Sequence, residues 1–546
     1  MADNNKAKQI INNSWLIVFV LVFATFLLEY FSCGFTAMRV YQDDMGFMAG
    51  VAKLAGFNWN EAISLTKYYG PCYYIFYFLV FKYVKDPLLI RNILIAGNGF
   101  VLALSSGILF FTLRNIFEKI GKWWLAFVSG ATVFSIIKLE TTLSNEYMNV
   151  CILSLIVFLL VKYFKTTKKK FKIVIAAFIV LSLIYAVSIH SRNVVLLIGI
   201  LVCIVWSTIK KQVSIKEMII WGAIMIVPVI CYKVLPSLFI RSIWVNISHT
   251  KNASVDAADM LSRVSSLKEF NLFLITIVGN FDMTIKNTFG VVLIGLYLYV
   301  LDLIKLGIRK INNEELVNEW PKHIALTFSI VCYGLGMVGT SMSWRGNPKG
   351  MGYWRYYGLY ILIFFAISMV SWFSEKQTRT KIIGYIGLLY VVVSKLFLVN
   401  VWPIVEKTRY YTYGIIDWMK SLSIEHSMML LISIIIISAV IAALILKKRI
   451  LFIVIVSLGI ILPSVQFPYL NKVECSGVAD QSLKIMNEYR EREDIEWYYY
   501  GEDDTYLYFQ YLLLDKKMEH FYHYDQYRSL PLDLAQSIFL HRIQNN

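Results

Sequence analysis

Tyr41-Gln42-Asp43-Asp44 places two adjacent carboxylates directly after the first long apolar run of the chain, Trp15 to Met38. An apolar run of roughly 20 residues can cross the hydrocarbon core of a bilayer as a helix, so we expect the acid pair at a membrane face. A purely structural interpretation is that the pair starts a helix, because aspartate is favoured in the first helical turn. The residues that follow favour a more specific interpretation.

Those residues predict an uncommon first outer loop. Met45 to Phe57 is rich in small and apolar residues and predicts a helix. Tyr68-Tyr69-Gly70-Pro71 then precedes a second apolar run, Cys72 to Val84. This run has about 13 residues, fewer than the roughly 17 that a span needs, so we expect a helix that lies in the membrane interface.

The composition of the whole chain indicates a polytopic membrane protein. Of its 546 residues 58% are hydrophobic and only 16% are charged, and the mean hydropathy is +0.59. The net charge of +17 does not indicate a nucleic-acid partner, because the basic residues form short clusters between apolar runs. The seven cysteines are scattered without a CxxC pair, so neither a disulfide framework nor a zinc site is predicted.

The alternation of apolar runs and basic clusters predicts about thirteen membrane-spanning helices in the plasma (cytoplasmic) membrane. With the N-terminus in the cytoplasm, Lys168-Lys169-Lys170 falls inside and the acid pair falls outside. Counting Cys72 to Val84 as a span would move those lysines outside, which favours the interfacial interpretation. A longer outer segment, Pro236 to Lys286, is expected to carry further interfacial helices, and a span is predicted over Asn287 to Leu306.

A change of composition predicts two domains. Residues 1–470 would form the membrane domain, and residues 471–546 carry 8 lysines and arginines against 14 aspartates and glutamates. This acidic balance predicts a soluble domain on the outer face. Its pattern predicts a small α/β fold, with a helix over Gln481 to Arg492, a strand over Ile495 to Tyr500, a helix over Thr505 to Leu514 and a strand over Met518 to Tyr524.

The order of these features resembles the integral-membrane glycosyltransferases of the GT-C fold, in the branch that includes protein mannosyltransferases and the aminoarabinose transferases of lipid A. The resemblance covers Trp15 to about Phe373, with motifs at Asp43-Asp44, Tyr69 to Pro71, Asn145-Glu146 and Arg355-Tyr356. It implies an all-α, GT-C-like membrane domain and an inverting enzyme. That enzyme would move one sugar from a polyprenyl-phosphate donor to a polysaccharide, lipid or protein of the cell envelope, on the outer face.

Glycosyl transfer needs a base for the acceptor hydroxyl and groups that stabilise the leaving phosphate. The resemblance implies that Asp43 is the base, and burial beside Asp44 could raise the pKa of one of the two carboxyls. Glu146 matches the second acidic position, where it could orient the acceptor or, with Asp43 or Asp44, hold Mg or Mn through oxygen ligands. Alternatively, Asn145 and Glu146 only cap a helix, and Glu140 is a rival for the same role.

A lipid-phosphate donor requires cations at the outer mouth of the bundle. Arg192, in the turn His190-Ser191-Arg192, and Arg355, at the start of a late span, are the main candidates, because arginine can bind phosphate through two hydrogen bonds. Either arginine could instead reach lipid headgroups beside aromatic residues of the interface.

Further residues are expected around the same mouth. Arg345 and Lys349, in a loop with glycine and proline, could close over the donor or contact lipid headgroups. His190 could carry a proton, although a lone histidine at a span end is more often a satisfied interface residue. The resemblance implies that Tyr69, Pro71 and Tyr356 position the substrate.

Two other functions stay open. A transporter (flippase) of lipids or lipid-linked glycans is also polytopic, but its site would lie near the midplane beside broken helices, whereas most charges here lie at the ends of apolar runs. A polysaccharide polymerase or ligase also has a large outer loop, and Pro236 to Lys286 is long enough for one. No Trp-Trp-Asp motif of oligosaccharyltransferases occurs in residues 471–546, so transfer of a whole glycan to asparagine is disfavoured.

Overall fold

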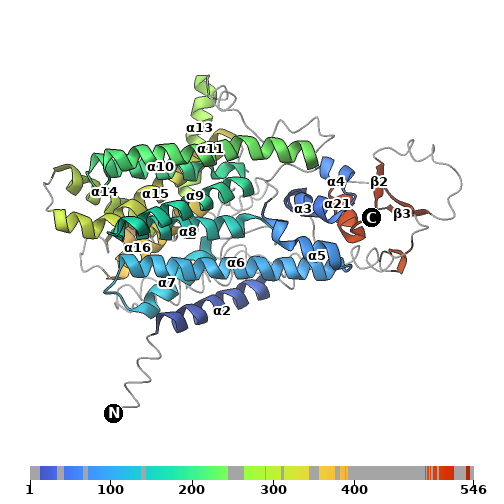
Figure 1. Ribbon diagram of the computed structural model, residues 1–546, viewed down its shortest axis with the longest axis horizontal. Coiled ribbons are helices and arrows are strands. Elements are labelled where there is room, and N and C mark those ends of the chain that lie inside the picture. The colour runs from blue at the N-terminus through green and yellow to red at the C-terminus, as the bar shows by residue number, and fades with distance from the viewer. Residues whose placement is uncertain are drawn as a thin grey trace, which may run out of the picture.

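The computed structural model describes residues 13–33, 42–65, 72–136, 143–243, 264–288, 290–308, 313–343, 356–374, 382–387, 389–391, 486, 488–490, 492, 496–500, 503–521 and 537–541. Most of them form a bundle of long helices that run roughly along the longest axis (Figure 1). Short helices and a small sheet gather at one end of this bundle, which we call the sheet end.

The bundle is all-α, as the sequence predicts. Its helices are α2 (Ser14–Cys33), α6 (Pro87–Ile116), α7 (Lys122–Ile136), α8 (Glu146–Lys165), α9 (Lys169–Ile189), α10 (Val194–Ile209), α11 (Ile215–Ile243), α14 (Val292–Ile308), α15 (Asn313–Ser343) and α16 (Leu362–Ser374). Among the described residues, six helices are long and apolar enough to cross a membrane, or up to seven if one bent pair counts as a single span. The protein is therefore an integral membrane protein. Other predicted spans are shorter helices here, and Met428 to Val465 lies outside the described residues.

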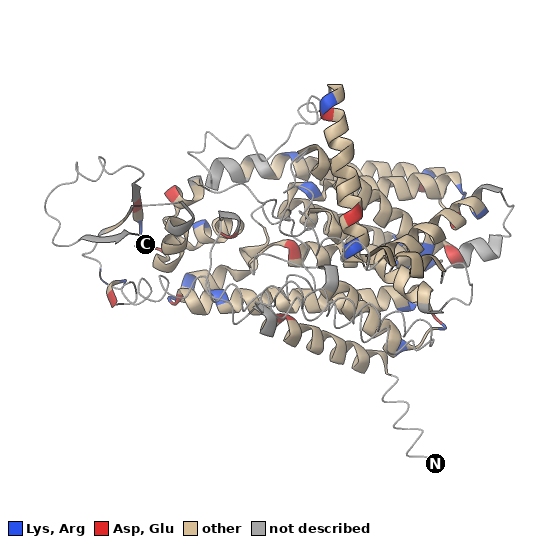
Figure 2. Cartoon of the chain, turned by 180° about the vertical axis from the view of Figure 1, so that it is seen from behind, with Lys and Arg blue, Asp and Glu red and all other residues tan. Residues whose placement is uncertain are grey.

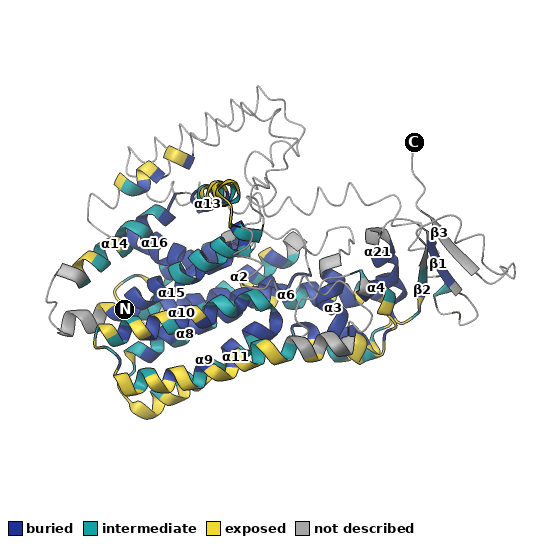
Figure 3. Ribbon diagram, turned by 90° about the horizontal axis from the view of Figure 1, so that it is seen from above, coloured by how far each residue is buried: buried dark blue, intermediate teal, exposed yellow. Residues whose placement is uncertain are grey.

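Burial varies systematically across the bundle. Helix α8 lies between α6, α9 and α15 and is largely buried, whereas α9 and α11 expose long apolar faces (Figure 3). On α11 the exposed side chains include Ile219, Ile226 and Ile230. In a membrane, exposed apolar faces of this length contact lipid. A helix can present such a face to lipid because its backbone groups are already hydrogen-bonded within the helix.

Several basic residues in the turns between the long helices lie at the end of the bundle opposite the sheet end (Figure 2). Lys165 at the end of α8 bonds the carbonyl of Asn115 at the end of α6. Lys172 at the start of α9 pairs with Glu217 at the start of α11. These contacts bring together the loops that the charge pattern assigned to one side of the membrane.

One predicted span has different boundaries in the structure. Helix α13 (Leu267–Asn287) projects from the bundle and meets α14 at a bend of 108°, so the predicted span Asn287 to Leu306 is shorter than expected (Figure 1). Gly290 makes this bend: its φ is +74°, and a Cβ there would lie 2.2 Å from the backbone of Gly387. Only glycine combines that dihedral angle with so close an approach. Residues 244–263 of the predicted outer segment lie outside the described residues.

The first outer loop forms short helices at the sheet end. Helix α3 (Gln42–Ala55) confirms the helix predicted over Met45 to Phe57 but begins earlier, so the acid pair lies in its first turn. The second apolar run forms η1 (Tyr74–Tyr77) and α5 (Phe78–Tyr83), which pack against α3, with α4 (Asn60–Ser64) nearby. Neither short helix could cross a bilayer, as predicted.

The described C-terminal residues form a parallel β–α–β unit with a third strand. The elements are β1 (Glu496–Tyr500), α21 (Asp503–Leu513), β2 (Met518–Phe521) and β3 (Ser537–His541), in the order β2-β1-β3. The strand, helix and strand predicted from the sequence are confirmed within a few residues, whereas β3 was not predicted. Trp497 is paired with both Met518 and Ile538 in parallel register. Helix α21 packs against α3, α4 and α6, so this unit touches the first outer loop.

Candidate active site

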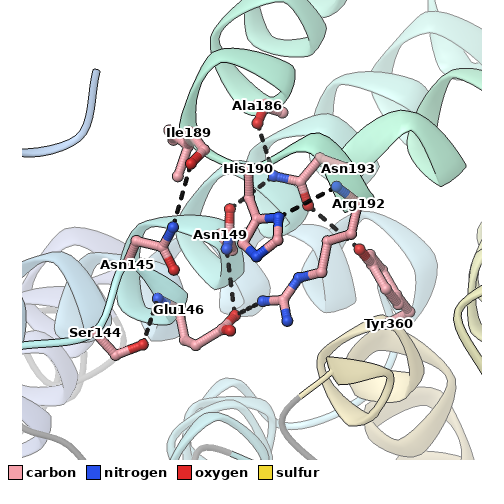
Figure 4. A network of polar contacts seen from close by, with 10 residues as sticks. All are labelled: Ser144, Asn145, Glu146, Asn149, Ala186, Ile189, His190, Arg192, Asn193 and Tyr360. Carbon is pink, nitrogen blue, oxygen red and sulfur yellow. Dashed lines mark hydrogen bonds and ion pairs between the residues drawn. The ribbon is translucent and has the colours of Figure 1, made fainter. Parts of the chain in front are cut away.

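The start of α8 carries the second predicted acidic position. Ser144 Oγ accepts a hydrogen bond of 3.2 Å from the backbone N–H of Glu146 (Figure 4). Asn145 is the N-cap residue but makes no side-chain cap bond; its Nδ2 instead donates to the carbonyl of Ile189, the last residue of α9, at 3.2 Å. That carbonyl has no partner within its own helix, so Asn145 joins α8 to α9. The buried Glu146 carboxylate therefore has a fixed backbone position.

Two side chains bind the Glu146 carboxylate. Its Oε2 accepts a hydrogen bond of 3.2 Å from Asn149 Nδ2 and forms a hydrogen-bonded ion pair with Arg192 Nη2 (Figure 4). Arg192 lies in η2 (Ser191–Asn193), the tight turn between α9 and α10. Its backbone N–H donates to His190 Nδ1 at 3.2 Å, so His190 caps the turn. The carboxylate also lies at the N-terminus of α8, where the helix dipole favours negative charge.

The Arg192 guanidinium keeps donors for a further partner. Its Cζ lies 5.2 Å from the centroid of the Tyr356 ring, within cation–π range. Its Nε and Nη1 are buried and have no hydrogen-bond partner in the part of the chain that the structure describes. Buried donors of a charged group are costly without acceptors. Because the planar fork of arginine matches the oxygens of a phosphate, this turn presents an anion-binding group.

A network of amides and a phenol holds the turn in place. Asn193 Nδ2 donates to Asn149 Oδ1 and to the carbonyl of Ala186, both at 2.7 Å (Figure 4). Tyr360, in η6 (Gly358–Ile361), donates its hydroxyl to Asn193 Oδ1 at 3.3 Å. The network joins α8, α9, η2 and η6, so the position of Arg192 depends on four elements at once.

The first acidic position lies nearby on α3. Asp44 is buried, and its charge is close to Tyr74, whose hydroxyl donates to the carbonyl of Leu143 and accepts from Asn98 Nδ2 at 3.4 Å. Burial raises the pKa of Tyr74 well above its usual value, the bond from Asn98 lowers it, and the Asp44 charge raises it. Tyr74 therefore stays a neutral donor that connects the surroundings of Asp44 to the residues just before Glu146.

Glu29 is a buried carboxylate of α2 that was not among the predicted site residues. Its Oε1 accepts a hydrogen bond of 2.8 Å from the hydroxyl of Tyr147, the residue after Glu146. An ionisable residue inside an apolar run is expensive in a membrane and is by default a functional candidate. That signal was present in the sequence and could have identified Glu29.

The structure brings together four of the predicted site residues, namely Glu146, Arg192, His190 and Tyr356. Asp44 lies on α3 and is connected to this group through Tyr74 and Leu143, and the backbone of Asp43 lies in the same helical turn. The side chain of Asp43 lies outside what the structure describes, as do the predicted residues Arg355, Arg345, Lys349, Tyr69 and Pro71 and the rival Glu140.

A metal site was predicted only conditionally, from Asp43, Asp44 and Glu146. Among the residues that the structure describes, no group of three or more His, Cys, Asp and Glu side chains could hold a metal ion. Of the predicted ligand set, Glu146 is bound by Arg192 and Asn149, and the side chain of Asp43 lies outside the described residues. Binding of Mg or Mn stays a prediction.

Comparison with known proteins gives matches to solved structures alone. No family model and no curated protein matches the chain. The chain is similar to the crystal structure of ArnT from Cupriavidus metallidurans bound to undecaprenyl phosphate, with 12% sequence identity, 92% of this chain and 85% of that chain covered, and a TM-score of 0.49. The apo state of the same protein matches with the same identity and coverage and a TM-score of 0.47. Similarity at this level does not by itself place the chain in a family or assign it a reaction.

Proposed function

We propose that this protein is an inverting glycosyltransferase. It moves one sugar from a polyprenyl-phosphate donor to an envelope polysaccharide, lipid or protein, on the outer face of the plasma membrane. The observation that carries the proposal is Arg192, a mostly buried cation at a membrane-helix end. Glu146 binds one of its nitrogens, while the buried Nε and Nη1 have no partner among the described residues. Such a group suits a phosphate that arrives from the lipid phase.

The reaction needs a base and a stabilised leaving group. Asp43 accepts the proton of the acceptor hydroxyl, whose oxygen attacks the anomeric carbon as the bond from that carbon to the phosphate oxygen breaks. The electron pair stays on the polyprenyl phosphate, and Arg192 stabilises the negative charge that develops there. The anomeric configuration inverts because the nucleophile enters opposite the departing phosphate.

The geometry supports a positioning role for Glu146. Its carboxylate is already bound by Arg192 and Asn149, so these two side chains fix its orientation. It fixes one edge of the guanidinium and thereby orients the remaining donors. His190 fixes the backbone of the same turn.

One observation favours the alternative of a transporter. The pair α13 and α14 bends by 108° at Gly290, and broken helices are common at transport sites. Transport sites lie near the membrane midplane, however, whereas Glu146 and Arg192 lie at helix ends. The position of the buried ion pair therefore favours the transferase.

The test is sugar transfer from radiolabelled polyprenyl-phosphate sugars into envelope material, with membranes of matched protein content. We expect transfer by the intact protein, its loss in Asp43→Asn and Arg192→Ala, and full transfer by the control Glu118→Gln at the opposite end of α8. If the intact protein transfers no sugar from any such donor but carries a lipid-linked glycan across vesicle membranes, the transporter replaces this proposal.

A further inference from the structure

Helix α21 is buried on two sides. Toward its own sheet, Tyr506 donates its hydroxyl to the carbonyl of Met518 at 3.0 Å, and Gln510 exchanges hydrogen bonds with the backbone of Lys516 and Met518. Toward the membrane domain it packs against α3, α4 and α6 (Figure 1). Helix α21 is therefore packed between its own sheet and the membrane domain.

Trp59 fastens the end of α21 to the first outer loop. It is fully buried, and its Nε1 donates to the carbonyl of Leu514 at 2.6 Å. Leu514 has a φ of +53°, the left-handed conformation that ends a helix, and the last carbonyls of a helix lack partners within it. The ring of Trp59 also lies 6.2 Å from that of Tyr511 and 6.4 Å from that of Phe81. A long-range hydrogen bond and an aromatic cluster thus join the two segments.

Tyr511 reaches further toward the acid pair. It is fully buried, and its hydroxyl donates to the carbonyl of Pro87, in the first turn of α6, at 3.1 Å. Burial raises the pKa of Tyr511, the positive charge of nearby Arg91 lowers it, and the charges of Asp44 and Asp86 raise it. The Tyr511 hydroxyl therefore stays protonated. It donates its hydrogen bond to Pro87 while it lies near the charges of Arg91, Asp44 and Asp86.

We propose that Tyr511 is a positioning residue of the candidate active site, and that α21 covers Asp44 in the first turn of α3. Helix α21 packs against both α3 and α6, and the hydroxyl of Tyr511 bonds the first turn of α6. Asp44 lies in the first turn of α3, one residue from the proposed base Asp43. The role in catalysis rests on the proposed transferase function, whereas the covering of Asp44 does not.

The covering is tested without activity, by labelling carboxyls of the intact protein with a water-soluble carbodiimide and an amine and reading the sites by mass spectrometry. We expect negligible labelling of Asp44 in the wild type and an increase of at least about tenfold in Trp59→Ala and Tyr511→Ala, since the carboxyl becomes accessible. Glu118, exposed at the far end, is the internal reference. Unchanged protection of Asp44 in both variants would overturn the covering.

The positioning role is tested with a matched pair of tyrosine variants. Tyr511→Phe removes the hydroxyl bond to Pro87, and the control Tyr506→Phe removes a similar bond inside the C-terminal unit. We expect Tyr511→Phe to lower kcat about tenfold and shift the acidic limb of the pH–rate profile, with the donor KM unchanged, because Arg192 is untouched. Tyr506→Phe should leave both unchanged.

The outcomes separate the two proposals. If Tyr511→Phe and Tyr506→Phe have the same kcat and pH profile, the positioning role is wrong even though the transferase stands. If the intact protein transfers no sugar, the transferase and the positioning role both fail, and the labelling of Asp44 still decides whether α21 covers it.

Discussion

Helix α8 carries an ion pair at each end, and the two pairs lie in opposite environments. At its N-terminus, the Arg192 and Glu146 side chains are 15% and 7% exposed; at its C-terminus, those of Lys165 and Glu118 are 31% and 70% exposed. Both pairs have the sign that the helix dipole favours. Water screens the charges of Lys165 and Glu118. Of the two pairs, therefore, only Glu146 and Arg192 can fix the orientation of their side chains by electrostatic attraction.

The difference shows what identifies a site in this protein. Lys165 also bonds the carbonyl of Asn115, so the exposed pair only ties a loop to α8. A buried pair pays a desolvation penalty that a hydrophobic pair of similar volume would avoid, so its presence at a helix end invites a functional explanation. Burial together with unused donors, rather than pairing, therefore separates Glu146–Arg192 from Lys165–Glu118.

The largest expected effect is that of Arg192→Ala. Removing the cation that we propose stabilises the leaving phosphate should lower the transfer rate by about 10²–10³-fold. Arg192→Lys should fall between this variant and the wild type, because lysine keeps the charge and loses the planar fork. Single-turnover transfer measures both. Normal transfer by Arg192→Ala would show that the pair at the N-terminus of α8 is no more important for function than the exposed pair at its C-terminus.

The next effect is on stability. Glu146→Gln leaves the Arg192 charge buried without its counter-charge, which should destabilise the protein by about 3–5 kcal/mol. The double variant Glu146→Gln with Arg192→Gln should recover much of that stability without recovering transfer. Denaturation in detergent, followed for all four members of the cycle, measures the coupling. Additive effects of the two substitutions would show that the pair does not act as a unit.

A smaller effect is expected for Asn193, which follows Arg192 in η2 but is not a member of the ion pair. Asn193→Ala removes the bonds to Asn149 and Ala186 and should cost about 1–3 kcal/mol, since their acceptors stay buried. Transfer should fall because the turn that holds Arg192 loosens. Unchanged transfer by Asn193→Ala would show that the turn is held by other contacts.

The smallest effect concerns the exposed pair and depends on pH. The hydrogen bond from Lys165 holds the pKa of Glu118 below its usual 4.5, so the stability that the pair contributes is present above that value. It is lost as pH falls through the lowered pKa of the folded protein. The small difference in Tm between the wild type and Glu118→Gln should therefore shrink on acidification. A difference that grows toward acid would contradict the assignment.

Local features of the fold could be predicted from the sequence. Apolar runs and their flanking charges indicate the spans, and the alternation near residues 495–521 indicates a strand, a helix and a strand, because each depends on neighbours a few positions apart. The bend at Gly290 could not be predicted, since it depends on the backbone of Gly387. Packing of distant segments leaves no periodic signal.

The candidate site was predicted as single residues and not as an arrangement. Arg192 was expected near the donor phosphate and Glu146 was expected to orient the acceptor or to help hold a metal ion, but their pairing depends on α8 meeting the turn after α9. Glu29 was missed even though a carboxylate inside an apolar run is visible in the sequence. The contact of Tyr511 with the start of α6 spans most of the chain, so no local pattern could indicate it.

The bond from Trp59 to Leu514 has a consequence for biosynthesis, because its partners are 455 positions apart. A ribosome that adds about 5–20 residues per second makes the first outer loop roughly 20–90 s before it makes α21. During that interval α3 and α4 lack the contacts that α21 makes with them. The packing of the first outer loop against α21 therefore forms only after residues 503–514 have been made, and a premature stop before them would leave an inserted loop without the bond from Trp59 to Leu514.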